Sequence, residues 1–137
     1  MTKIEMEARI AELGGWNEIN AIKVSWEKYQ GFLRRNIKPN RNEITARTCG
    51  CCQWYLYKRR GKYDKNGCND CVMMAYDLEC GLEGQNMECV SEWHNLNDIV
   101  TDPDVRGNWR TAVRAIIKVL EKGLKERAKR KELNDEL

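Results

Sequence analysis

The sequence contains no long hydrophobic run. Its apolar stretch from Val72 to Tyr76 covers five residues, whereas a membrane-spanning helix needs roughly 20. The N-terminus also lacks the apolar segment of a secretory signal, which is roughly 7–15 residues long. These absences predict that the protein has no membrane partner and is cytoplasmic, while a periplasmic or virion destination stays open, because a mature sequence would show no signal.

Histidine is almost absent. His94 is the only one among 137 residues, which excludes an H-E-x-x-H metalloprotease and argues against a histidine-rich treble-clef nuclease, which needs more than one histidine. The His-x-Glu and Pro-Cys-x-x-Cys elements of a zinc deaminase are missing as well. We therefore predict that the protein is not an enzyme and has no small-molecule substrate. A nucleophilic Cys51 close to positive charge stays open as the exception.

Positive charge is missing from one long segment. Residues 68–104 carry nine Asp or Glu and no Lys or Arg, while the flanking parts 1–67 and 105–137 carry 14 and 10 basic residues against 7 and 5 acidic ones. The net charge of +3 hides this segregation. It predicts an acidic and a basic face, each suited to a partner, unless the two neutralise each other within the fold.

Helix signals divide the chain into three parts of one compact domain. Residues 1–42 predict a helical pair with a linker: Thr2 and Glu5 form a capping-box pattern, and a glycine pair ends the first helix. Residues 43–100 form the cysteine-rich part. Residues 101–137 predict one long basic helix, beginning at a Thr101 cap and a proline in the first turn.

The seven cysteines are the strongest chemical signal. Cys49 and Cys52 form one C-x2-C pair, Cys68 and Cys71 form a second, and 15 residues separate the pairs. This spacing is typical of a zinc site, because two such turns point four thiolates at one tetrahedral centre. We therefore predict one structural Zn²⁺ on these four ligands, with a four-thiolate iron centre as the main competitor.

Three further residues are secondary metal ligands. Cys80, Cys89 and His94 follow the second pair and could complete a second site or replace one pair. Otherwise the two cysteines are ordinary buried thiols and the histidine is a hydrogen-bonded structural residue.

The cysteine layout over about residues 49–120 resembles small cysteine-rich proteins encoded by bacteriophages, and zinc-ribbon or zinc-knuckle modules in general. The likeness implies zinc and a phage or mobile-element origin but no particular activity. One departure is Val72, where a proline often follows the second knuckle in those proteins. The fold class predicted is mainly α with a small zinc-bound β-hairpin or knuckle module, zinc-ribbon or treble-clef-like.

Two basic elements suit nucleic acid. The first is an aromatic run leading into cations, which predicts a β-hairpin or knuckle over 53–63 that stacks bases and meets phosphates, although its aromatic part could instead pack on the zinc module. The second is the charged side of the C-terminal helix, which is opposite its apolar stripe and could otherwise be only a solvated face. The predicted binding residues are Trp54, Tyr55, Tyr57, Lys58, Arg59, Arg60, Arg110, Arg114, Lys118 and Lys122.

The predicted function is a zinc-stabilised accessory or regulatory protein that binds nucleic acid, either DNA or RNA. The alternative is a protein-binding inhibitor of a host or defence enzyme, which would act through the acidic 68–104 surface. An apolar contact patch within this surface would contribute, formed by Val72, Met73, Met74, Tyr76 and Trp93. Salt separates the two, because phosphate contacts give a steep salt dependence and a mostly apolar protein interface does not.

Overall fold

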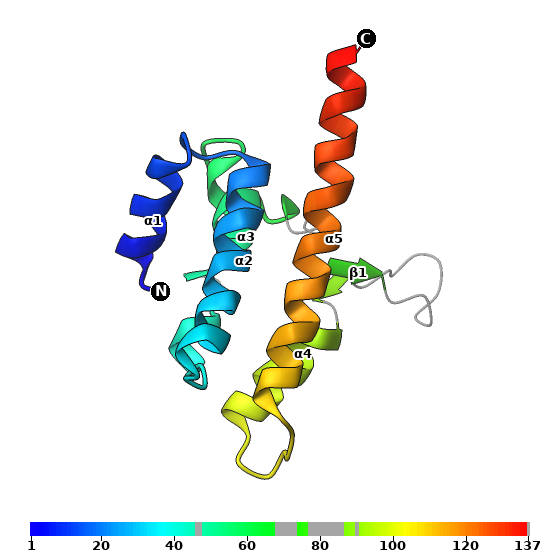
Figure 1. Ribbon diagram of the computed structural model, residues 1–137. Coiled ribbons are helices and arrows are strands. Elements are labelled where there is room, and N and C mark those ends of the chain that lie inside the picture. The colour runs from blue at the N-terminus through cyan, green and yellow to red at the C-terminus, as the bar shows by residue number, and fades with distance from the viewer. Residues whose placement is uncertain (46–47, 68–73, 77–86, 90, 137) are drawn as a thin grey trace.

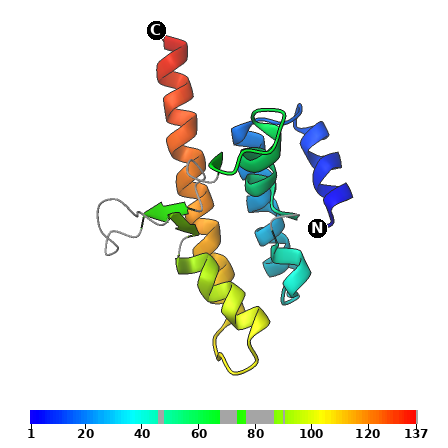
Figure 2. The same ribbon diagram turned by 180° about the vertical axis from the view of Figure 1, so that it is seen from behind.

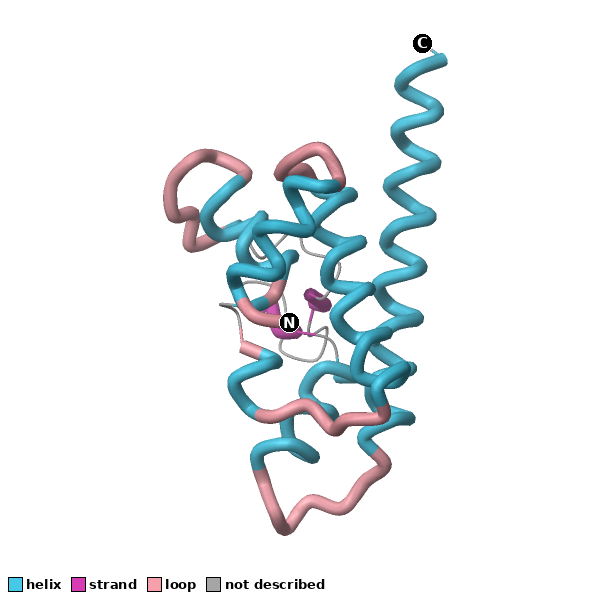
Figure 3. Tube along the Cα trace, turned by 60° about the vertical axis from the view of Figure 1, so that its left-hand side comes forward, coloured by secondary structure: helices cyan, strands magenta, loops and turns pink. Residues whose placement is uncertain are grey.

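The computed structural model describes residues 1–45, 48–67, 74–76, 87–89 and 91–136, with side chains left undescribed at 74–76, 87–89, 91–92 and 134–136. The described chain is mainly helical (Figure 3), which confirms the mainly α part of the predicted fold class. The elements in chain order are α1 (Lys3–Glu12), α2 (Glu18–Arg35), the 3₁₀ turn η1 (Arg41–Ile44), α3 (Gly50–Gln53), the π-helix η3 (Trp54–Lys58), β1 (Met74–Tyr76), β2 (Met87–Cys89), α4 (Ser91–Thr101) and α5 (Trp109–Glu136).

The first two helices begin and end at the residues that their caps specify. Thr2 accepts a hydrogen bond from the Glu5 amide at 3.1 Å and donates its own amide to the Glu5 carboxylate at 3.3 Å, so the predicted capping box is present. Gly14 and Gly15 then take φ angles of 106° and 107°, which favour glycine, and the chain turns into α2.

The core is formed where α2 and α5 pack side by side, with α4 folded back against α5 (Figure 1). The predicted apolar stripe of α5 faces this core at Val113, Ile116 and Leu120, which are all fully buried. A second, smaller cluster joins α1 to α2 through Met6, Ile10 and Val24. The C-terminal end of α5 projects beyond the other helices in both opposite views (Figures 1 and 2).

The start of the C-terminal helix was predicted wrongly. Thr101 is the last residue of α4, and its hydroxyl donates to the Asn97 carbonyl at 2.7 Å, so it serves the preceding helix. Asn108 caps α5 instead: its side chain accepts from the amides of Arg110 at 2.9 Å and Thr111 at 3.3 Å.

The predicted β-hairpin over 53–63 is also wrong. Residues 53–58 are helical, and the Arg59 amide donates to the Trp54 carbonyl at 2.8 Å, five residues back. Helical spacing places Cys51 and Tyr55 on one buried face, so packing overrides the strand preference of the aromatic residues. A short antiparallel pair of strands lies further along, where Met74 is opposite Cys89 and Tyr76 is opposite Met87.

None of the described helices has the length and hydrophobicity that a bilayer-spanning segment needs.

Candidate functional site

The first cysteine pair lies at the start of the short helix α3. Cys49 caps the short helix α3, and its sulfur accepts a hydrogen bond from the Cys52 amide at 3.5 Å. Both thiols are half-buried. Gly50 lies between them and packs against α2, because a Cβ there would be 2.7 Å from the Ala21 carbonyl oxygen. The pair is therefore held firmly on the helical core.

Cys51 belongs to the core rather than to this pair. Its side chain is fully buried, and the Ser25 hydroxyl both accepts from the Cys51 amide at 3.2 Å and donates to its sulfur at 3.4 Å. A thiol without surface exposure is poorly placed to attack a substrate in solution. None of the three described cysteines forms a disulfide.

Electrostatics favours the thiolate form at Cys49. Hydrogen bonds with the Cys51 and Cys52 thiols, and then the charge of Lys28, hold the pKa of Cys49 well below its usual range. Lys28 is buried on α2 and donates to the Thr48 carbonyl and hydroxyl, both at 3.2 Å. Burial in turn lowers the pKa of Lys28. Because metals bind the thiolate and not the thiol, this environment suits a metal ligand.

The linker between the two predicted cysteine pairs folds back onto η3, the helix that directly follows the first pair. The Asp64 amide donates to the Leu56 carbonyl at 2.8 Å, and Gly67 packs so closely that a Cβ there would lie 1.8 Å from the Tyr55 carbonyl oxygen. Gly67, the last described residue before the second cysteine pair, therefore packs against η3, the helix that follows the first pair.

The remaining predicted ligands are only partly described. Cys68, Cys71 and Cys80 lie outside the described residues, and Cys89 is placed only as a strand residue of β2. His94 is exposed on α4, with its ring against the neighbouring Trp93 at 5.5 Å between centroids. Within the described ranges, no three His, Cys, Asp or Glu side chains gather as a metal site needs.

The structure divides the predicted aromatic-basic run into an inner and an outer part. Trp54 is half-buried against the core and Tyr55 is only 1% exposed, so the ring of Tyr55 has no face open for stacking. Arg59 lies over the Tyr55 ring at 5.4 Å and is 3.5 Å from Asp64.

The outer part of the run is Tyr57, Lys58 and Arg60, all exposed. Arg60 is 3.4 Å from the same Asp64. Only this outer part is open to a ligand.

Tyr55 also ties three elements together. Its hydroxyl donates a hydrogen bond to the carboxylate of Glu18 at the start of α2. Glu18 also forms an ion pair with Arg127 on α5 at 3.1 Å. Burial, followed by the hydrogen bond to Glu18, raises the pKa of Tyr55. The Tyr55 hydroxyl is therefore already engaged within the fold.

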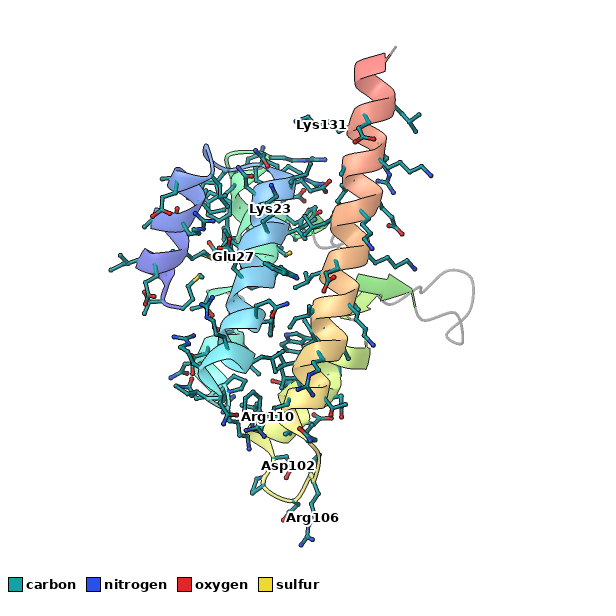
Figure 4. The ribbon with its side chains drawn as sticks, viewed as in Figure 1. Lys23, Glu27, Asp102, Arg106, Arg110 and Lys131 are labelled. Carbon is teal, nitrogen blue, oxygen red and sulfur yellow. The ribbon has the colours of Figure 1, made fainter. Side chains whose placement is uncertain are left out.

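The predicted basic side of α5 is exposed, with one exception. Arg110, which is labelled in Figure 4, is half-buried and stacks on the Trp109 ring at 4.9 Å. Its guanidinium group donates to the side chain of Asn36 at the end of α2. Arg114, Lys118 and Lys122 are exposed, and the same side continues through Lys125 and Lys129. We call these last five residues the α5 basic row.

The predicted acidic surface lies largely outside the described side chains. Of its nine acidic residues, Asp98, Asp102 and Asp104 are described, and all three are exposed. The Asp102 side chain accepts from the Asp104 amide at 2.9 Å, which is a turn within the loop between α4 and α5. Trp93, predicted as part of an apolar contact patch, packs against the core cluster.

One group of surface residues was not predicted as a unit. Lys3 from α1 lies with Tyr57, Lys58, Lys62 and Tyr63 around one groove. The basic and aromatic character of 57–63 is visible in the sequence, but the contribution of Lys3 depends on how α1 packs. No sequence signal reports that contact.

Comparisons of this chain with protein-family models, curated proteins and solved structures find no match.

Proposed function

We propose that this chain is a zinc-stabilised protein that binds nucleic acid through the α5 basic row. The supporting observation is the row itself: five cations follow one side of a long helix, and each side chain is exposed. At about 1.5 Å per residue, the span from Arg114 to Lys129 is about 22 Å. A DNA duplex carries roughly one phosphate charge per 1.7 Å of its axis, so the row meets many phosphates at once.

The row is free to meet a partner. Within the described part of the chain, no ion pair joins any of its five cations to an acidic side chain, including Glu121 and Glu126 on the same helix. The opposite side of the helix is occupied, because Val113, Ile116 and Leu120 are buried in the core. The helix can therefore present its charges without losing its packing.

The zinc would be structural. In this proposal Cys49 and Cys52 hold Zn²⁺ together with Cys68 and Cys71, which lie outside the described residues. Four thiolate ligands close the coordination sphere and leave no position for a reacting water. The support is the knuckle hydrogen bond at Cys49, its lowered pKa, and the return of the linker onto Tyr55. The proposed protein is a binding protein of the accessory or regulatory kind rather than an enzyme.

A matched pair of charge reversals tests the nucleic-acid role. One variant changes Arg114, Lys118 and Lys122 to Glu, and the control changes the exposed Lys38, Arg41 and Arg106 to Glu. Both variants carry the same net charge, and Arg106 lies on the distant loop between α4 and α5 (Figure 4). We expect the first variant to lose binding to a labelled duplex and a single strand, as measured by fluorescence anisotropy, and the control to lose much less.

Equal losses in the two variants would show that overall charge and not the row drives binding. Unchanged binding in both would leave the row as a solvated surface. If the wild type binds no nucleic acid, the alternative of a protein partner for the acidic 68–104 surface becomes the leading hypothesis.

A further inference from the structure

A second feature of the surface is a groove between the start of α1 and the turn that follows η3. It has a volume of about 750 Å³ and is lined by Lys3, Gln53, Tyr57, Lys58, Gly61, Lys62 and Tyr63. Gly61 has a φ of 73° and reverses the chain, which brings the two tyrosines onto the same wall. The lining contains three lysines and no acidic residue.

The two tyrosines form an exposed aromatic pair. Their ring centroids are 5.5 Å apart with an angle of 40° between the ring planes. Tyr57 is 44% exposed and Tyr63 is 62% exposed. Single exposed apolar residues are common on protein surfaces, but two rings in contact with each other, in a groove, form a surface on which a flat ligand can stack.

The lysines around the pair supply the charge. Lys58 is 3.8 Å from Glu7 and lies over the Trp16 ring at 5.5 Å, so it is already engaged with neighbouring residues. Lys3 and Lys62 are exposed and, within the described ranges, have no ion-pair partner. These two cations therefore complement an anionic group held beside the rings.

We infer that this groove binds an unpaired nucleotide of a single-stranded nucleic acid, with its base on the Tyr57–Tyr63 pair and its phosphates near Lys3 and Lys62. Bases inside a duplex are stacked on each other and offer no free face, so the groove selects single strands. Aromatic stacking tolerates any base, since every base has a π-face, and predicts little sequence preference. This inference rests on the proposed function and adds a second binding surface, which is specific for unpaired bases.

The test compares a labelled oligothymidine, an oligouridine of the same length and a DNA duplex of matched length, each titrated with the full-length protein. The variants are Tyr63→Ala, Tyr63→Phe and the double charge change of Lys3 and Lys62 to Glu. We expect Tyr63→Ala to weaken single-strand binding by about 5- to 150-fold, the loss expected for one stacked base. Tyr63→Phe keeps the ring and should bind single strands like the wild type. Neither Tyr63→Ala nor Tyr63→Phe should affect duplex binding.

Because Tyr63 is largely exposed, its replacement should leave the thermal midpoint unchanged, and circular dichroism checks this. If Tyr63→Ala binds single strands as tightly as the wild type while the α5 row variant does not, the groove proposal is wrong and the proposed function stands. If Tyr63→Ala weakens duplex and single-strand binding equally, the selectivity for unpaired bases is wrong. If the wild type binds none of the three probes, the proposed function itself fails.

Discussion

Replacing Gly67 by alanine should disrupt the contact by which the linker after η3 packs against the backbone of Tyr55. A Cβ at this position would lie 1.8 Å from the carbonyl oxygen of Tyr55 and 2.6 Å from its carbonyl carbon. Real Cβ contacts do not fall below 3.0 Å. The neighbouring atoms are backbone, so no side chain can rotate to make room, and the linker must move away by more than 1 Å.

Backbone shifts forced by an extra methyl group in a packed site cost about 1–3 kcal/mol. A domain of this size loses about 4 °C of thermal midpoint per kcal/mol, so we expect a fall of roughly 4–12 °C. The control is Gly31→Ala in α2, where the new Cβ meets only the flexible end of Arg35 at 3.2 Å. Alanine is favoured over glycine in a helix by about 1 kcal/mol, so this change should leave stability equal or higher.

Thermal unfolding followed by circular dichroism measures both variants, and elemental analysis measures their zinc. Gly67→Ala should lower the thermal midpoint. In the proposed zinc site it should also reduce the bound metal, because Gly67 directly precedes the predicted ligand Cys68. The reasoning is refuted if Gly67→Ala is as stable as Gly31→Ala and retains the same zinc content.

Three further perturbations test other parts of the structure. Cys52→Ser should abolish zinc binding and lower the thermal midpoint, as treatment with a chelator should. Cys51→Ser should keep its zinc, because the Cys51 thiol is buried against Ser25. Equal zinc loss in both variants would contradict the proposal that Cys52, and not Cys51, is a zinc ligand. Tyr55→Phe removes the donor to Glu18 and should cost about 1.5–3 kcal/mol in urea unfolding. Burial raises the pKa of Tyr55 above its unfolded value, so its contribution is present below pH ~10 and is lost as pH rises further; Tyr55→Phe should show a shallower alkaline fall in stability. Leu120→Ala empties a fully buried site on α5 and should cost about 2–5 kcal/mol; a cost below 1 kcal/mol would mean that α5 does not pack as described.

The helical framework could be predicted from the sequence because its signals are local. The capping box at Thr2 and Glu5 and the glycine pair after α1 act within a few residues, and both are present in the structure. The apolar spacing of α5 likewise predicts the burial of Val113, Ile116 and Leu120, since period alone defines a helix face.

Two local patterns misled the prediction, because tertiary contacts decided between alternatives that were locally similar. Thr101 and Asn108 are both capable caps, and the path of the chain between α4 and α5 selects the second. The aromatic run after Cys52 has strand-forming residues, but burying Cys51 and Tyr55 together requires helical spacing.

The candidate sites show the same limit. The spacing of the cysteines and the charge of α5 follow from the sequence alone. The groove does not, because Lys3 and Tyr63 are 60 residues apart and are brought together only by the packing of α1 beside η3.

The salt dependence of nucleic-acid binding tests the central claim most directly. If the five cations of the α5 basic row each neutralise one phosphate of a duplex, log affinity should fall against log salt with a slope of about −4.5. Between 50 and 200 mM salt this corresponds to a loss of about 500-fold, with the α5 row variant showing a much shallower slope. Undetectable duplex binding at 50 mM salt, or an affinity that is the same at both salt concentrations, would contradict the account.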